Sequence, residues 1–198
     1  MKHLLLTGFD PFGGAYINPA WEAVRRVPDT VGDCRVERLE IPTVFGLAAD
    51  TVIKKAEEMP SPPDIILCIG QAGGRASVTP ELIAINHRNA SIPDNAGNCF
   101  HASPVLEHAP AAYFSTLPVY EMAAAVSAAG IPAAVSYSAG TFVCNDTLFL
   151  LLHHFRASPV RVGFVHVPFL PEQLKDGAHP SMPLDDMVSA LIKMIEIL

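Results

Sequence analysis

Short apolar runs alternate with helix-like patterns along the chain. The apolar runs span residues 3–7, 64–70, 81–87, 133–137 and 160–167. Several are almost continuously apolar, which is typical of strands in a sheet that is covered on both faces. The helix-like patterns begin near Pro19, Gly46, Val119, Asn145 and Leu184. We therefore predict a single three-layer α/β/α domain built on a twisted, mixed and mostly parallel sheet.

Loops rich in small or polar residues follow four of the predicted strands. They begin near residues 7–9, 70–72, 136–138 and 166–168. In open α/β sheets, ligands bind beyond the carboxyl ends of the strands, where loops lead into helices. We therefore expect a functional site among these loops.

Two of the loops are glycine-rich, TGFDPFGG at residues 7–14 and GQAGGR at residues 70–75. Neither has the glycine spacing or the lysine of a phosphate-binding loop, so the sequence does not favour nucleotide binding. The glycines fit tight turns, or a backbone that approaches a small ligand. Phe9 and Phe12 follow no strand or helix periodicity, so we expect them to line an apolar pocket.

The length and charge of the chain limit its class. Its 198 residues fit one domain, residues 1–198, that is large enough to bury a core. The formal net charge is -7, the sequence pI is about 5.5, and no cluster of Lys and Arg is present. Nucleic acids and anionic membranes attract clustered positive charge, so neither is expected as a partner.

The N-terminal segment predicts a strand rather than a signal peptide, because it has one positive charge and a very short apolar run. Residues 122–145 carry no charged side chain, a length that could span a membrane. Gly130, Pro132 and Gly140 divide that segment into a helix, a turn, a strand and a loop. We therefore expect a cytoplasmic protein that does not cross a membrane.

The cysteines are not arranged for disulfides or for a metal. Cys34, Cys68, Cys99 and Cys144 lie far apart in a chain that is large enough to fold without disulfides. No CxxC pair is present, so a structural zinc site is not predicted. The sequence therefore predicts reduced thiols and no metal.

Cys144 is the leading candidate for a nucleophile. It lies between the small-residue loop 138–142 and the apolar, helix-like run 147–155. A thiol at a helix N-terminus lies near the positive end of the helix dipole, which favours the thiolate, the form that attacks carbonyl groups. The alternative is that Cys144 is a small residue of the core.

A thiol nucleophile needs a base, and His166 is the best-placed histidine. It lies near the end of the predicted strand 160–167, whose carboxyl end should face the same side as Cys144. His153 and His154 follow Cys144 by more than two helical turns, too far to reach its thiol. The alternative for His166 is a hydrogen-bonded histidine of the core.

Glu81 is the candidate acid that orients the base. It begins an apolar run, so its carboxylate is expected to be partly buried and to need a partner. Asp94 and Asp146 compete for this role. Asp94 also fits a turn, and Asp146 fits the first turn of a helix.

Taken together, the motifs resemble one family. The motifs, in order, are LLTGFDPFGG at 5–14, INP at 17–19, GQAGGR at 70–75, PE at 80–81, AIN at 84–86, IPDN at 92–95, SAGTFVCN at 138–145 and GFVHVP at 163–168. The chain resembles the type I pyroglutamyl peptidases, also called pyrrolidone-carboxylate peptidases. The resemblance implies a catalytic cysteine, histidine and glutamate at Cys144, His166 and Glu81, the same three residues that the thiol argument selects.

The resemblance implies that the chain removes an N-terminal 5-oxoproline residue from blocked peptides through a thioester, without a metal or organic cofactor. It also implies a homotetramer, with a homodimer as the second choice. The mean hydropathy of +0.31 and the 17% of charged residues support self-association, since apolar surface beyond the needs of the core is buried in interfaces.

A pocket for this substrate needs apolar walls, one hydrogen-bond donor and one acceptor, because 5-oxoproline is a flat, neutral lactam. The candidate wall residues are Phe9, Phe12, Ile92 and Phe142. Asn18 is the candidate donor to the ring carbonyl, and the backbone of Gln71 is the candidate acceptor from the lactam N–H. Asn18 also fits a helix cap, and Phe142 also fits the core.

The chain departs from the family pattern at two positions. Ser91 stands where members generally have Arg, and Asp146 stands where many have His. If that Arg polarises the site, either Arg75 or Arg88 must replace it, or the activity is altered. Two other classes remain open: a phosphorylase with an anion site near Arg75, and a binding or redox-sensing module in which Cys144 is oxidised.

Overall fold

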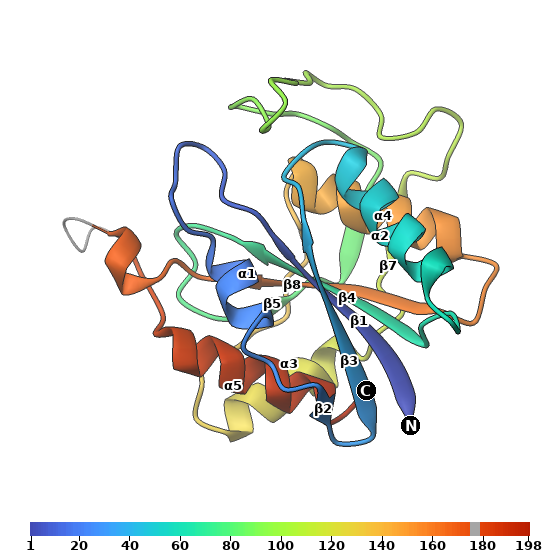
Figure 1. The fold of residues 1–198 in the computed structure, drawn as a ribbon. Coiled ribbons are helices and arrows are strands. Elements are labelled where there is room, and N and C mark those ends of the chain that lie inside the picture. The colour runs from blue at the N-terminus through green and yellow to red at the C-terminus, as the bar shows by residue number, and fades with distance from the viewer. Residues whose placement is uncertain (175–178) are drawn as a thin grey trace.

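The computed structural model describes residues 1–174 and 179–198. These residues form a six-stranded sheet in the order β2-β3-β1-β4-β8-β5 (Figure 1). Strands β3 (Cys34–Ile41), β1 (Lys2–Phe9), β4 (Ile65–Gln71) and β8 (Arg161–Val167) run parallel. The short strands β2 (Thr30–Val31) and β5 (Thr79–Pro80) pair antiparallel at the two edges. The prediction of a mixed, mostly parallel sheet is confirmed.

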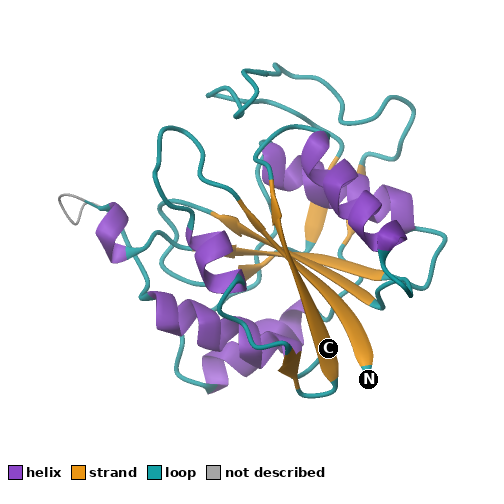
Figure 2. Cartoon of the chain, viewed as in Figure 1, coloured by secondary structure: helices purple, strands orange, loops and turns teal. Residues whose placement is uncertain are grey.

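Helices cover both faces of this sheet (Figures 1 and 2). Helices α1 (Pro19–Val24), α3 (Val119–Ala128) and α5 (Leu184–Ile195) lie on one face, where α5 contacts both α1 and α3. Helices α2 (Leu47–Glu58) and α4 (Val143–Phe155) pack together on the other face. A short 3-10 helix spans Pro171–Gln173. Within the described residues, the five α-helices begin within two residues of their predicted starts, which confirms the three-layer arrangement.

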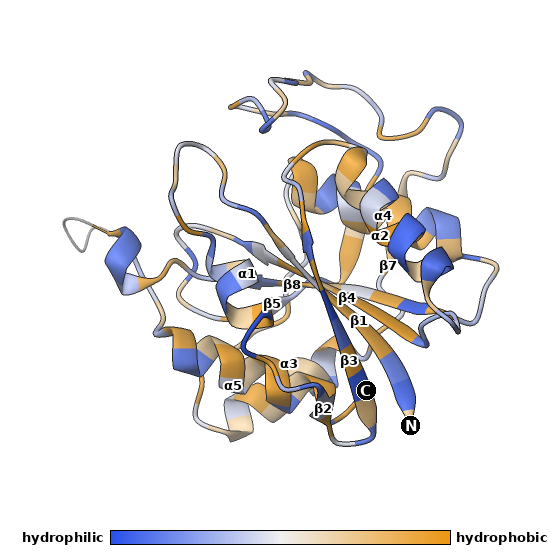
Figure 3. Cartoon of the chain, viewed as in Figure 1, coloured by the Kyte–Doolittle hydropathy of each residue, from blue (hydrophilic) through white to orange (hydrophobic). Residues whose placement is uncertain are grey.

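The two faces of β1 contribute to two separate cores. Leu4 and Leu6 belong to the cluster under α1 and α5, whereas Leu5 and Phe9 belong to the cluster under α2 and α4. Figure 3, coloured by hydropathy, shows apolar stretches in the central strands and in the helices on both faces of the sheet. Since each buried leucine contributes about 1.5–3 kcal/mol, these alternating contacts hold β1 in register at the centre of the fold.

The predicted strand 81–87 is confirmed only over residues 83–85, because two short strands lie on either side of Glu81. Residues 79–80 form β5 in the main sheet. Residues 83–85 form β6 (Ile83–Ile85), which pairs with β7 (Ala112–Phe114) in a separate two-stranded sheet. The chain therefore leaves the main sheet at Glu81.

The predicted strand 133–137 is wrong as a continuous element. It pairs with the β5 region only through the isolated bridges Val78–Ala133 and Glu81–Ser136. The N–H of Val78 donates to the carbonyl of Pro132. The N–H groups of Ala134 and Ser136 donate to the carbonyls of Val78 and Pro80, respectively. Pro80 has no N–H to give to the carbonyl of Ala134, so the ladder is interrupted at this point.

Strand β3 is the main element that the apolar runs did not predict. Its sequence CRVERLEI alternates apolar and charged residues, and its burial alternates in the same way over the first four residues. A strand at the side of a sheet needs only one buried face, so a search for continuous apolar runs misses it. Among the described residues, no helix combines the length and the apolar character needed to cross a bilayer.

Candidate active site

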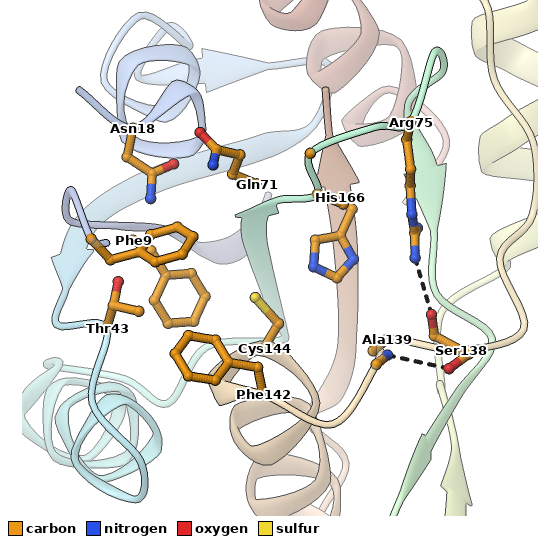
Figure 4. Close-up of a pocket in the computed structure, with 14 residues that line it drawn as sticks. Phe9, Asn18, Thr43, Gln71, Arg75, Ser138, Ala139, Phe142, Cys144 and His166 are labelled. Carbon is orange, nitrogen blue, oxygen red and sulfur yellow. Dashed lines mark hydrogen bonds between the residues drawn. The ribbon is translucent and has the colours of Figure 1, made fainter. Parts of the chain in front are cut away.

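A cavity of about 430 Å³ opens at the carboxyl ends of β1, β4 and β8 (Figure 4). Its position agrees with the expectation for an α/β sheet. The residues that line it are Phe9, Phe12, Asn18, Thr43, Gln71, Ala72, Gly73, Arg75, Ser138, Ala139, Gly140, Phe142, Cys144 and His166. The cavity therefore brings together residues from both glycine-rich turns, the loop before α4 and the end of β8.

Cys144 is the second residue of α4, and its half-buried side chain points into the cavity (Figure 4). The helix begins after Phe142, which makes no side-chain capping bond, so the first-turn N–H groups are left for another acceptor. Gly70 makes room for the thiol: a Cβ atom at that position would lie 2.9 Å from the Cys144 sulfur and 2.7 Å from the ring of Phe164.

Burial raises the pKa of the Cys144 thiol to about 12, and the negative charge of Glu81 acts in the same direction. The helix dipole was expected to favour a thiolate, but the apolar surroundings have the larger effect. The thiol is therefore protonated in the free protein at neutral pH, and it needs a base to remove its proton.

His166 and Glu81 form a buried pair behind the thiol. The Nδ1 atom of His166 lies 2.7 Å from Oε1 of Glu81, and both side chains are almost completely buried. Nδ1 donates to the carboxylate, which leaves Nε2 as the acceptor on the imidazole. Burial lowers the pKa of His166 although Glu81 raises it, so the ring is neutral at neutral pH. Burial alone would raise the pKa of Glu81, but the hydrogen bond from His166 and the positive charge of Arg75 help to outweigh burial and lower it.

The other two candidate acids have different partners. The Asp94 carboxylate accepts hydrogen bonds from the N–H groups of Phe45, Ala96 and Asn98, which is the turn role. Asp146 accepts from Arg88 Nε at 2.5 Å and from the N–H of Gly46 at 2.8 Å. Neither carboxylate bonds to His166, so Glu81 is the acid that the structure brings to the candidate base.

Arg75 and Asn145 make contacts in the site that the sequence did not predict. Arg75 donates from Nη1 to Glu81 Oε1 at 2.6 Å and from Nη2 to the carbonyl of Ser138 at 3.0 Å. The buried Asn145 side chain bonds to both the N–H and the carbonyl of Ile85, each at 2.9 Å, and so joins α4 to β6. An Asn directly after a candidate nucleophile was the only signal in the sequence.

Three of the four predicted wall residues line the cavity. Phe12 and Phe142 have ring centroids 6.1 Å apart, and Phe9 is buried against Phe164 at the same centroid distance. Ile92 is not among the lining residues: its side chain is 41% exposed and lies near the turn at Gly13.

The predicted polar residues both line the cavity and make structural hydrogen bonds. Asn18 caps α1 by accepting from the N–H of Ala20 at 3.0 Å, and its Nδ2 donates to the carbonyl of Asp10 at 2.8 Å. An amide nitrogen has two hydrogens, so one donor of Asn18 is left for the cavity. The side chain of Gln71 accepts from Gln173 at 2.8 Å, whereas the predicted role belongs to its backbone.

The two departures at Ser91 and Asp146 do not bring Arg88 into the cavity. The Arg88 guanidinium is bonded to Asp146 and lies 4.8 Å from the ring centroid of Phe100. Arg75 lines the cavity instead. Of the two arginines considered as replacements, Arg75 is therefore the one that faces the site.

Comparison with known proteins identifies the family. Residues 2–198 match the family model for pyroglutamyl peptidase. The pyrrolidone-carboxylate peptidase of Lactobacillus helveticus is 46% identical over 196 residues, covering 98% of this chain and 96% of that protein. The corresponding protein of Enterococcus faecalis is 45% identical, covering 98% of this chain and 91% of its own length.

Solved structures agree with this assignment. The crystal structure of Bacillus amyloliquefaciens pyroglutamyl peptidase I has a TM-score of 0.95 and 42% identity, covering 99% of this chain and 96% of that chain. The pyrrolidone carboxyl peptidase of Thermococcus litoralis has a TM-score of 0.92 and 35% identity, covering 100% and 93%. The chain described here belongs to the pyroglutamyl peptidase family.

Proposed function

We propose that this chain is a cysteine peptidase that removes an N-terminal pyroglutamyl residue from blocked peptides, with residues 1–198 acting as one catalytic domain. The observation that carries the proposal is the arrangement of Cys144, His166 and Glu81: the thiol and the imidazole face one cavity, and the carboxylate holds the imidazole from behind. Family membership supports the same activity, since the relatives are pyroglutamyl peptidases.

In the proposed reaction, Nε2 of His166 accepts the proton of the Cys144 thiol as the sulfur attacks the pyroglutamyl carbonyl carbon. The C–N bond then breaks, and His166 returns the proton to the departing amine, which leaves a thioester. Water, activated by the same imidazole, cleaves the thioester and restores the thiol. Glu81 stabilises the imidazolium through the 2.7 Å contact to Nδ1.

The tetrahedral intermediate carries a negative oxygen that needs fixed donors. The N–H groups of the first turn of α4, which lack intrahelical partners, are suited to this role together with the positive end of the helix dipole. Because these groups belong to the same turn as Cys144, the attack itself brings the oxygen next to them.

The pocket walls suit a flat lactam. Phe9, Phe12 and Phe142 supply the apolar faces, the remaining amide hydrogen of Asn18 donates to the ring carbonyl, and the Gln71 carbonyl accepts from the lactam N–H. Ile92 lies at the more exposed turn near Gly13, where it would contact the substrate only from outside the cavity. Prolyl groups lack the ring carbonyl and bring a charged amine, so the pocket should reject them.

Release of a fluorescent amine from pyroglutamyl aminomethylcoumarin tests the proposal directly. The wild-type protein should cleave this amide and should leave the prolyl and glutamyl amides intact. Cys144→Ala should abolish turnover and Cys144→Ser nearly so, since a hydroxyl is a far weaker nucleophile at neutral pH. Iodoacetamide should inactivate the wild-type protein by modifying Cys144.

The same assay separates the alternatives. A phosphorylase would require phosphate and would leave the amide uncut, and a redox or binding module would not release the amine at all. Hydrolysis that persists undiminished in purified Cys144→Ala would refute the thiol mechanism.

We further propose that the protein works in the cytoplasm as a homotetramer, with a homodimer as the second choice. The four cysteines are all free, which suits a reducing compartment. Exposed aromatic side chains, including Phe114, Tyr120 and Tyr137, are the kind of surface that homomeric interfaces bury. Nucleic acids and membranes are not proposed as partners. Cell fractionation with an antibody against the chain tests the location.

A further inference from the structure

The guanidinium of Arg75 joins two parts of the site that come from different segments. Nη1 contacts Glu81, the acid behind His166, and Nη2 donates to the carbonyl of Ser138. Ser138 lies at the start of the loop that leads through residues 139–142 into Cys144. Figure 4 shows the long side chain of Arg75 reaching alongside His166 toward Ser138. One side chain therefore touches both the acid and the loop that carries the nucleophile.

We propose that Arg75 is a positioning residue of this active site: it orients the Glu81 carboxylate toward His166 and compensates its charge, and it fixes the Ser138 end of the nucleophile loop. The inference rests on the proposed peptidase function and adds a fourth member to the group of Cys144, His166 and Glu81.

The burial of Glu81 explains why a cation is needed there. The carboxylate has no exposed surface, and its Oε2 atom makes no hydrogen bond within the described residues. Oε1 alone carries the contacts to His166 and Arg75. A buried carboxylate is costly unless a positive charge compensates it, and His166 is neutral before the reaction begins. Arg75 is the cation in contact with Glu81 at that stage.

The charge of Arg75 also acts on the base. The titratable groups around the imidazole are Glu81, Arg75 and the thiol of Cys144. Glu81 favours the imidazolium and Arg75 opposes it, while the thiol stays uncharged because burial raises its pKa. Loss of Arg75 should therefore raise the pKa of His166, and loss of the Glu81 charge should lower it.

Two substitutions separate charge from geometry. Arg75→Gln removes the charge. In the pH profile of kcat/KM, the acidic limb, where activity falls as His166 is protonated, should therefore move up by about one pH unit, and kcat at neutral pH should fall about 100-fold. Arg75→Lys keeps the charge, so the limb should stay in place. Its kcat should still fall about 10-fold, because one ammonium group does not span Glu81 and Ser138 as the planar guanidinium does.

Arg88→Gln is the matched control. Arg88 is also a partly buried arginine in an ion pair, but it bonds to Asp146 and does not line the cavity. Its loss should lower stability and leave the acidic limb where it is. Glu81→Gln should move the limb in the opposite direction, to lower pH. If Arg75 only supported its own turn, Arg75→Gln would lower stability without moving the acidic limb.

A measurement without turnover separates this inference from the proposed function. The pKa of His166, followed by NMR of its ring proton and assigned with His166→Ala, should rise in Arg75→Gln. Wild-type turnover combined with an unchanged limb and an unchanged His166 pKa in Arg75→Gln overturns the inference alone. Absence of wild-type turnover overturns the proposed function, while the NMR titration still tests the charge effect. If Arg75→Gln does not fold, Arg75→Lys decides: wild-type kcat in that variant refutes the positioning role.

Discussion

At the scale of single residues, the site depends on burial more than on the helix dipole. Burial keeps both the Cys144 thiol and the His166 ring uncharged, so the free protein holds a neutral pair rather than an ion pair. Proton transfer then accompanies attack on the substrate. This arrangement predicts both a pH profile and a steric constraint.

The pH profile follows from the lowered pKa of His166. The neutral ring is required as the base, so kcat/KM should be lost as the pH falls through the His166 pKa, with a midpoint below its ordinary value of 6.5. His166→Ala should lose about 10⁴-fold in kcat, and Glu81→Gln about 100-fold, because an amide still hydrogen-bonds to the ring but does not stabilise its charge.

His153→Ala is the control for this series, since His153 bonds to the hydroxyl of Tyr113 and does not line the cavity. The assignment of His166 as the base would be wrong if His153→Ala or His154→Ala abolished activity while His166→Ala stayed active.

The steric constraint concerns Gly70. A methyl group there would lie 2.7 Å from the Phe164 ring and 2.9 Å from the Cys144 sulfur, so Gly70→Ala must displace the nucleophile or the ring. We expect a loss of at least about 10-fold in kcat/KM, since small misplacements of reacting groups are costly. Gly130→Ala is the control. A Cβ atom at Gly130 would meet open space, but the backbone there has a φ of +80°. The substitution should therefore cost about 1–2 kcal/mol of stability and leave kcat/KM unchanged. Equal kinetics in the two variants would contradict this account.

At the scale of elements, α4 is held by polar side chains in its first turn. Asn145 bonds to the backbone of β6, and Asp146 bonds to Arg88 and to the N–H of Gly46 just before α2. These contacts hold the nucleophile helix against two segments that are distant in sequence, residues 85–88 and the start of α2. They explain why two consecutive polar residues are buried at the start of an otherwise apolar helix.

The Arg88–Asp146 ion pair should therefore stabilise the fold. Asp146→Ala leaves Arg88 without its partner in a mostly buried position, and we expect a loss of about 3–5 kcal/mol in the free energy of unfolding. Arg88→Met with Asp146→Leu should recover part of that loss, because no buried charge is left unpaired. Urea denaturation of Arg88→Met, Asp146→Leu and the double variant checks this cycle. Losses that simply add would mean that the two side chains do not interact.

At the scale of the whole molecule, the prediction concerns self-association. The chain is apolar for its size, and Tyr16, Phe114, Tyr120 and Tyr137 are more than half exposed. The single-chain mass is 21.2 kDa. We expect light scattering at micromolar concentration to give about four times the single-chain mass for a tetramer, or about twice the single-chain mass for a dimer. A mass near 21.2 kDa would refute self-association.

Local sequence patterns determined much of this protein. The helix starts, three central strands and the Asn18 cap with Pro19 were predicted, because periodicity and capping act over a few residues. The sequence also pointed to Cys144 at a helix start, to His166 near a strand end and to Glu81 at the start of an apolar run.

Tertiary structure alone decided the rest. The strand predicted from 81 to 87 breaks at Glu81, and the missing N–H of Pro80 interrupts the ladder to residues 133–137. Arg75 joins Glu81 to the carbonyl of Ser138, which is distant in sequence. The thiol pKa likewise depends on how deeply the fold buries Cys144, which no spacing along the chain records. Pairing, burial and charge contacts join residues that are distant in sequence, so they are settled only when the sheet and its two helix layers come together.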